Sequence, residues 1–141
     1  RFLQGPCVLR ECPDSQTLRA AFRMEVTRTQ RRSDGTVSLN GQRFAFQGYL
    51  PAKDAERVKA LREIEIESRK RGQTQIFIET PYRNRQLFDS ILQTCQPGTR
   101  IAVATDLSLP GESVRTRTVL QWKKETPPEI ERHPTVFLLL A

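Results

Sequence analysis

The order of short apolar segments and longer amphipathic segments between residues 44 and 141 constrains the fold of this chain most strongly. Two helix-like segments, residues 53–71 and Tyr82–Cys95, each separate one strand-like segment from the next. A strand, a crossover helix and a second strand normally place the two strands side by side and parallel. The later strand-like segments are joined only by turns or loops, which predicts antiparallel pairings. The order β-α-β-α-β-β-β therefore predicts an α/β domain with a mixed sheet.

The hydrophobic periodicity supports these assignments. The predicted strands cover residues 43–51, 74–78, 100–105, 114–122 and 136–140. The predicted helix Tyr82–Cys95 has one continuous apolar face, formed by Leu87, Phe88, Ile91, Leu92 and Cys95. The predicted helix 53–71 is highly charged and ends at Gly72, and its expected buried stripe is Ala55, Val58, Leu61 and Ile64.

The first part of the chain has a different pattern. Residues 1–13 show no period and are predicted to form a loop or a frayed terminus. A short helix is expected from Asp14 or Ser15 to about Arg23. Residues 26–47 alternate between strand-forming segments and two turn signals of the Asp-Gly and Asn-Gly type, which predicts a small β-meander. Phe44 and Phe46, two residues apart, are expected to face the core.

Composition limits the classes of partner. The net charge is +7. Residues 1–43 hold eight arginines against four acidic residues, and residues 44–141 hold 15 basic against 12 acidic residues. A basic balance favours a polyanion such as RNA or DNA, or simply reflects a solvated surface. The longest apolar run has six residues, so no membrane association is expected.

Several kinds of site are not expected. The three cysteines and the single histidine lack zinc-site spacing, so neither a metal site nor a disulfide framework is predicted. The seven glycines are too far apart for a P-loop or a dinucleotide-binding motif. His133, in a loop between Arg132 and Pro134, is expected to be a solvated surface residue.

The candidate ligand site lies where predicted strands end and helices begin. The segment Ile78–Asn84 follows one strand, and Glu79 and Arg83 within it either form a structural ion pair or face a ligand. Tyr82 offers a stacking ring. Asp106 and Glu112 follow another strand, and we expect them to come from a neighbouring strand end and share one cleft with Glu79.

A second candidate site is the arginine cluster on and beside the predicted meander. It consists of Arg28, Arg31, Arg32 and Arg43. Arginines along a twisted ribbon can contact a phosphate backbone, and a solvated strand face is the alternative.

Four segments in order resemble the tetrapyrrole methylase superfamily, the class III methyltransferases that use S-adenosylmethionine. They are Arg43–Pro51, Ile78–Arg83, Ile101–Leu107 with Glu112, and Val136–Leu140. The resemblance covers residues 39–141, about 100 in number, and is similar to the branch with the small-subunit ribosomal RNA ribose methylases. It implies the C-terminal half of a two-domain enzyme whose cofactor lies between the halves.

This resemblance implies a set of residues for the cofactor or substrate cleft, with no catalytic residue assigned. The residues are Gly48, Leu50, Pro51, Glu79, Pro81, Tyr82, Arg83, Thr105, Asp106, Leu107 and Glu112. Without the glycine-rich N-terminal half, the chain is expected to bind S-adenosylmethionine weakly or not at all by itself and to be inactive alone.

Residues 14–46 resemble a different family, the small C-terminal β-domain of integrase-type (Mu-like) transposases. Leu18–Phe22, Thr27–Thr29 and Arg32–Phe44 carry this resemblance. The predicted organisation is thus a basic, transposase-like unit in residues 1–43 and a methylase-like α/β domain in residues 44–141.

Two functions follow as expectations. The first is the substrate-side half of an S-adenosylmethionine-dependent methyltransferase. The alternative is a nucleic-acid-binding module related to the transposase domain. A cytoplasmic location and a homodimer are also expected. A fusion product without a selected function is the third possibility.

Overall fold

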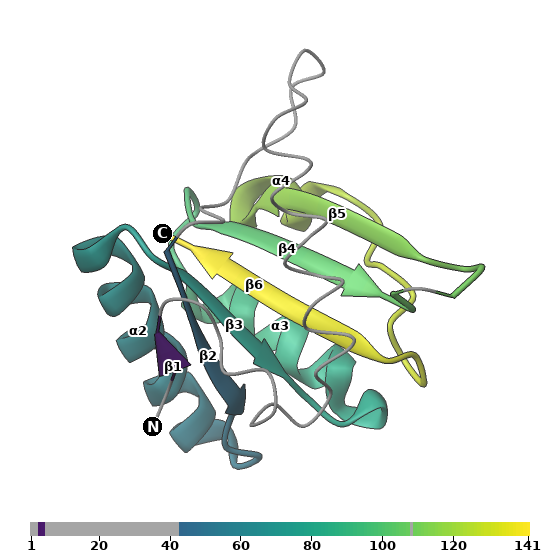
Figure 1. Ribbon diagram of the computed structural model, residues 1–141, viewed down its shortest axis with the longest axis horizontal. Coiled ribbons are helices and arrows are strands. Elements are labelled where there is room, and N and C mark those ends of the chain that lie inside the picture. The colour runs from purple at the N-terminus through teal and green to yellow at the C-terminus, as the bar shows by residue number, and fades with distance from the viewer. Residues whose placement is uncertain (1–2, 5–42, 108) are drawn as a thin grey trace.

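The computed structural model describes residues 3–4, 43–107 and 109–141 and contains one mixed six-stranded sheet (Figure 1). The order of strands across the sheet is β1-β2-β3-β6-β4-β5. Their bounds are β1 Leu3–Gln4, β2 Phe44–Tyr49, β3 Thr74–Ile78, β4 Arg100–Thr105, β5 Ser113–Thr118 and β6 Thr135–Leu140. The α/β fold class with a mixed sheet is therefore confirmed.

Strand β6 lies in the middle of the sheet, which corrects part of the predicted topology. β2 and β3 are parallel neighbours, as expected, but β3 and β4 each pair with β6 in the antiparallel direction. All six residues of β6 are buried. A strand that is apolar on both faces is most stable where both of its edges and both of its faces are covered, and the space between β3 and β4 provides this.

The three α-helices of the described residues cover one face of the sheet (Figure 1). They are α2 Asp54–Arg71, α3 Asn84–Thr94 and α4 Val119–Lys124. Their buried side chains form one core with that face, where the rings of Phe77 and Phe137 stack at 5.9 Å and Phe88 meets Trp122 edge-on at 5.3 Å. Each fully buried aromatic or aliphatic side chain of this kind contributes about 1.5–3 kcal/mol to folding.

The alternate residues of the same strands form a second apolar cluster on the other face. Phe44, Phe46, Ile76 and Leu138 belong to it, so the prediction that the two β2 phenylalanines face a core is confirmed. Among the described residues no helix packs on this face. The sheet is therefore apolar on both sides, as its nearly continuous hydrophobic strands require.

Helix α2 buries a different stripe from the one predicted. Leu61 and Ile64 are in the core, but Ala55 is exposed and Val58 only half-buried. The other buried positions are polar and hydrogen-bonded. Arg57 donates to Ser90 of α3 at 2.9 Å, and Glu65 accepts from the backbone of Gln96 at 2.7 Å. Periodicity of apolar residues alone misses such a stripe, because several of its positions are polar side chains that are buried with hydrogen-bond partners.

The segment predicted as a strand over residues 114–122 is in fact a strand followed by a helix. β5 ends at Thr118, and α4 begins at Val119. Thr118 caps the helix by accepting from the Gln121 amide at 3.2 Å, while the Gln121 side chain accepts from the Thr118 amide at 2.8 Å. This capping box, with Trp122 buried against β4, overrides the strand propensity of the segment.

The N-terminal predictions lie almost entirely outside the described residues. The exception is β1, which pairs with Phe46 and Ala45 of β2 in the antiparallel direction. The prediction that residues 1–13 form only loop was therefore wrong at Leu3 and Gln4. The predicted helix after Asp14 and the earlier strands of the meander stay predictions.

Cys95 lies at the end of α3 and is buried, as its position on the apolar face of the helix predicted. Burial, together with the nearby Glu65 carboxylate, raises the pKa of the Cys95 thiol from 9.0 to about 12. The thiol is therefore protonated and unreactive at neutral pH.

Replacing Thr118 by Ala should lower the free energy of unfolding by about 1 kcal/mol, because the first turn of α4 loses its cap. Urea denaturation measures the change. Thr126→Ala, at an exposed position just after the same helix, is the matched control and should leave the midpoint unchanged. Equal stability of Thr118→Ala and the wild type would contradict the capping role.

Cys95 makes stability fall at alkaline pH. The thiol has a higher pKa in the folded than in the unfolded state, so its contribution is complete below pH 9.0 and is lost as the pH rises through about 12. In a Cys7→Ser/Cys12→Ser background, the further change Cys95→Ala should flatten this decline, measured by urea denaturation between these pH values. An unchanged slope would show that Cys95 does not cause it.

Candidate functional site at the carboxyl edge of the sheet

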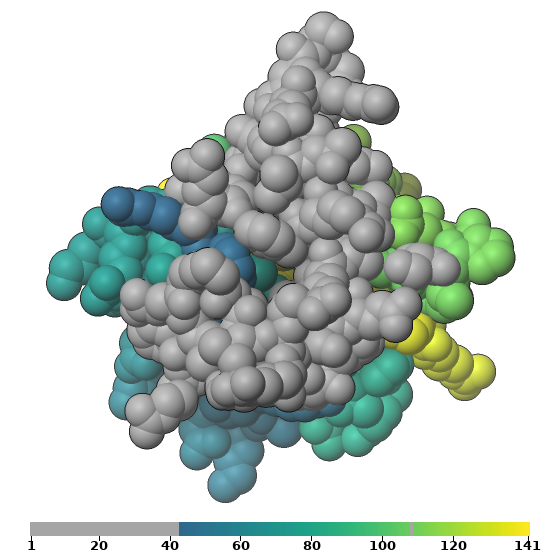
Figure 2. Space-filling view, in the orientation of Figure 1, coloured from purple at the N-terminus to yellow at the C-terminus, as the bar shows by residue number. Residues whose placement is uncertain are grey.

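The sheet places the ends of β2, β3 and β4 at one edge, together with the segment that leads into β6. The register pairs Tyr49 with Ile78, Ile78 with Val136, and Thr105 with Thr135. Segments that follow β4 (green) and precede β6 (yellow) lie next to each other on the molecular surface (Figure 2). We call this end of the sheet the carboxyl edge. It is where open α/β sheets commonly bind ligands.

Glu79, Tyr82 and Arg83 form one cluster directly after β3. The Glu79 side chain is only 3% exposed, and its Oε1 accepts from the Thr80 amide at 2.7 Å and lies 3.9 Å from Nη1 of Arg83. The Arg83 guanidinium lies 5.0 Å from the centre of the Tyr82 ring, which is exposed. Glu79 therefore stabilises the turn, whereas Tyr82 and Arg83 are accessible to a ligand.

The turn around Glu79 begins a helix in two steps. Pro81–Arg83 forms a short 3-10 helix, η2, and α3 follows from Asn84. Pro81 suits the first position because its ring fixes φ and its missing N–H would have no helical partner there. Glu79 and Arg83 thus form the ion pair across the turn that was one of the two predicted alternatives, and a contact of either residue with a ligand stays a prediction.

Asp106 follows β4 and adopts a left-handed backbone conformation with φ 51°. Its amide donates to the Pro134 carbonyl at 3.0 Å, and its own carbonyl accepts from the Leu109 amide at 3.0 Å. Thr105 and Leu107 on either side are buried, and Glu112 is exposed at the end of the turn. The turn therefore directs Asp106 toward the segment before β6.

The expectation that Asp106 and Glu112 come from the strand next to β3 was wrong, because β6 separates β3 from β4. In the described residues, the side-chain partner of Asp106 is His133, with 2.8 Å between Oδ2 and Nδ1. His133 is thus half-exposed but paired, rather than simply solvated. Sequence reasoning had no signal for this contact, which joins residues 27 positions apart.

Asn84 connects the two parts of the edge. It is fully buried at the start of α3, and its Nδ2 donates to the carbonyl oxygens of Ile130 and His133 at 2.9 and 2.8 Å and lies 3.1 Å from Oγ1 of Thr135. Its Oδ1 has no hydrogen-bond partner among the residues that the structure describes. Asn84 therefore fixes the loop that carries His133. A polar residue at the first position of a helix is a sequence signal that could have indicated this role.

The end of β2 is held by Arg57 of α2. Gly48 has φ 71°, where the register of β2 against β3 shifts by one residue. Leu50 is buried and Pro51 half-buried. Arg57 donates to the Ala52 carbonyl at 2.8 Å and pairs with Asp54 at 2.8 Å, which ties this segment to the start of α2.

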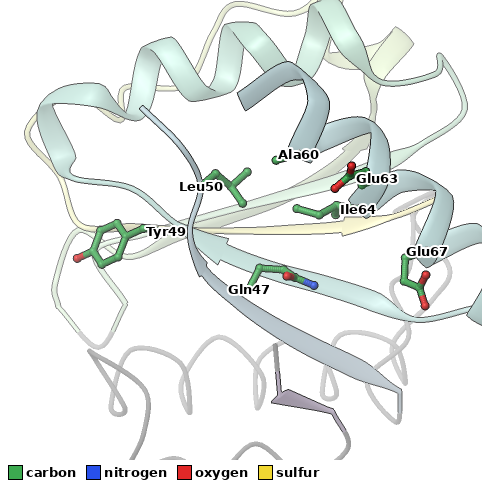
Figure 3. A pocket seen from close by; sticks show the side chains of 7 residues that line it. All are labelled: Gln47, Tyr49, Leu50, Ala60, Glu63, Ile64 and Glu67. Carbon is green, nitrogen blue, oxygen red and sulfur yellow. The ribbon is translucent and has the colours of Figure 1, made fainter. Parts of the chain in front are cut away.

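A pocket of about 410 Å³ lies between β2 and α2 (Figure 3). Among its lining residues only Leu50 belongs to the predicted cleft; the others include the acidic Glu63 and Glu67. In Figure 3, Leu50 and Ile64 point into the space from the strand side and the helix side, and Tyr49 points away at its end. The structure therefore does not bring the predicted cleft residues together in this pocket.

Three further observations concern metal binding, membrane crossing and the arginine cluster. Within the described ranges no three His, Cys, Asp or Glu side chains gather closely enough to hold a metal ion, and no described helix is long and apolar enough to cross a membrane. Arg43 is exposed, and its Nη1 donates to the Arg71 carbonyl at 3.3 Å. Arg28, Arg31 and Arg32 lie outside the described residues, so the arginine cluster stays a prediction.

Known proteins include relatives of this chain in sequence and in structure. The chain is 32% identical over 92 residues to the ribosomal RNA small subunit methyltransferase I of Escherichia coli O157:H7, which covers 63% of this chain and 31% of that protein. The chain therefore spans about a third of the relative it matches. No family model matches the chain.

The crystal structure of the methyltransferase CobJ aligns with 69% of this chain and 40% of its own, at a TM-score of 0.44 and 18% identity. The similarity of this chain to a methyltransferase thus rests on its sequence match. The transposase-like resemblance receives no such support.

Asn84→Ala should lower the free energy of unfolding by about 1–3 kcal/mol, because the buried carbonyl oxygens of the loop before β6 lose their donor. Hydrogen exchange should show faster exchange in residues 130–135. Gln86→Ala, at an exposed position on the same helix, is the control and should change neither quantity. Unchanged exchange in Asn84→Ala would show that the loop is held by other contacts.

Proposed function

We propose that this chain is the C-terminal, substrate-side half of an S-adenosylmethionine-dependent methyltransferase of the tetrapyrrole methylase type. The observation that carries the proposal is the 32% identity over 92 residues to a ribosomal RNA methyltransferase. The fold adds support, because three of the four segments that resemble the family end at the carboxyl edge of one mixed sheet, and the fourth, Val136–Leu140, begins there.

The residues of the carboxyl edge fit part of a cofactor site. The exposed Tyr82 ring, with the Arg83 guanidinium on it, offers a stacking surface for an adenine base. The Asp106 carboxylate, paired with His133, adds a polar group to the same edge. Glu79 is buried and bound to the Thr80 amide, so it positions the turn rather than the cofactor.

The bound cofactor would supply the electrophilic methyl group. The remaining task is alignment of that group with the acceptor, which depends on a site closed from both sides. The chain provides one side, and it spans 31% of the relative. We therefore propose that S-adenosylmethionine binds productively only when a second half completes the cleft.

Small-subunit ribosomal RNA is the methyl acceptor that the relative's name suggests, and we propose it as the substrate of the completed enzyme. Homodimer formation and a cytoplasmic location stay predictions. The nucleic-acid-binding module related to a transposase is the less favoured function, because the sequence match is to a methyltransferase.

A chimera tests the proposal. In it, residues 44–141 of this chain replace the matching segment of the E. coli relative. Calorimetry should show saturable S-adenosylmethionine binding by the chimera and none by this chain alone. Arg83→Ala in the chimera should weaken binding, because the stacking surface at Tyr82 loses its guanidinium. Arg85→Ala is the control, since Arg85 pairs with Asp89 on the exposed side of α3.

A folded chimera that binds no S-adenosylmethionine would contradict the assignment to this class of enzyme. Tight, saturable binding by the isolated chain would contradict the claim that it forms only half of the site. Transfer of a labelled methyl group from S-adenosylmethionine to small-subunit ribosomal RNA, measured with the binding-competent chimera, tests the proposed acceptor.

A further inference from the structure

Asp106 and His133 lie in contact at the carboxyl edge, in a geometry that selects one tautomer of the neutral imidazole. Oδ2 of Asp106 lies 2.8 Å from Nδ1 of His133. An ionised carboxylate only accepts hydrogen bonds, so the neutral ring must carry its proton on Nδ1. Nε2 then carries the lone pair, and none of the described residues donates a hydrogen bond to it. The side chain of His133 is 46% exposed, so the ring is accessible from outside the fold.

The backbone holds both partners of this pair in place. Asp106 is fixed at φ 51° by hydrogen bonds from its amide to Pro134 and from Leu109 to its carbonyl. The His133 carbonyl is held by the buried Asn84, and Arg132 just before it has φ 66°. Asp106 and Arg132, the residue before His133, are both non-glycine residues in the left-handed region, and backbone strain of this kind concentrates at functional sites.

We propose that Asp106 and His133 form a proton-accepting dyad, in which Nε2 of His133 takes the proton from the methyl acceptor. This inference rests on the proposed methyltransferase function and goes beyond it by assigning the base. The acceptor is a hydroxyl or N–H group. As its heteroatom bonds to the methyl carbon, the carbon–sulfur bond breaks with its electron pair on sulfur, and the released proton moves to Nε2.

Asp106 has two effects in this dyad. It orients the ring so that Nε2 faces away from the carboxylate, and its negative charge stabilises the imidazolium that forms when Nε2 gains the proton. The other charged groups of the two turns, Glu112, Glu129, Glu131 and Arg132, are all exposed. Asp106, with its side chain only 16% exposed, is therefore the charged group that sets the orientation of the His133 ring and stabilises its positive charge.

The first test uses the full chain alone and does not depend on the cofactor. His133 is the single histidine, so ¹⁵N NMR reports its two ring nitrogens without overlap. The spectra are recorded at pH ~8.5, in the range where free imidazole is neutral. The wild type should show the Nδ1–H form, in contrast to the Nε2–H form that predominates in free histidine.

Two variants and a control make this test decisive. Asp106→Asn and Asp106→Gly both tolerate a positive φ, so each removes the carboxylate without backbone strain. Both should shift His133 toward the Nε2–H form and slow its modification at Nε2 by diethyl pyrocarbonate several-fold. Glu131→Gln removes a nearby exposed carboxylate and should behave like the wild type. A wild-type ring in the Nε2–H form, or one unchanged in both Asp106 variants, would overturn the dyad.

The second test measures the catalytic role in the chimera. His133→Gln should lower kcat for methyl transfer by about 10²–10⁴-fold, the usual contribution of a positioned base, and leave KM for S-adenosylmethionine nearly unchanged. Glu131→Gln should leave both unchanged. Equal kcat in His133→Gln and the wild type would overturn the role as base. A chimera that binds no cofactor would contradict the proposed function instead. The NMR result on the chain alone would still show whether Asp106 and His133 form the dyad.

Discussion

The central position of β6 is the constraint on which the rest of the described structure depends. This strand is buried along its whole length and forms antiparallel ladders with β3 on one side and β4 on the other. Because β6 joins these two strands, it sets where their carboxyl ends lie and brings the loop before it to the same edge. The helices α2, α3 and α4 then pack on one face of a sheet whose layout β6 has already determined.

Buried polar contacts fix the loops of the candidate site to the helices that pack on the sheet. Asn84 fixes the loop before β6 to the start of α3, and Arg57 fixes the end of β2 to the start of α2. Both side chains are buried, and each satisfies backbone carbonyl groups that would otherwise be costly to remove from water. The carboxyl edge is therefore held by a few hydrogen bonds, and its functional side chains keep defined positions although they lie on loops.

Much of the fold was predictable from the sequence, because the apolar periodicity of α3 and the stop at Gly72 are local signals. The Glu79–Arg83 pair was predictable for the same reason. The insertion of β6 between β3 and β4 was not, because strand order depends on which edge best covers an apolar segment rather than on the segment itself. α4 was missed because a two-residue capping box outweighed the strand propensity around it. The Asp106–His133 contact depends on both the strand order and two left-handed residues, so no local pattern indicates it.

The central claim is that the carboxyl edge is one wall of an S-adenosylmethionine site. Ultraviolet cross-linking of radiolabelled S-adenosylmethionine to the chimera, followed by mapping of the labelled peptides, tests it most directly. The account predicts label within residues 79–85 or 105–112 of this chain. Label that is confined to the segments lining the pocket between β2 and α2, or that is absent from this chain altogether, would contradict it.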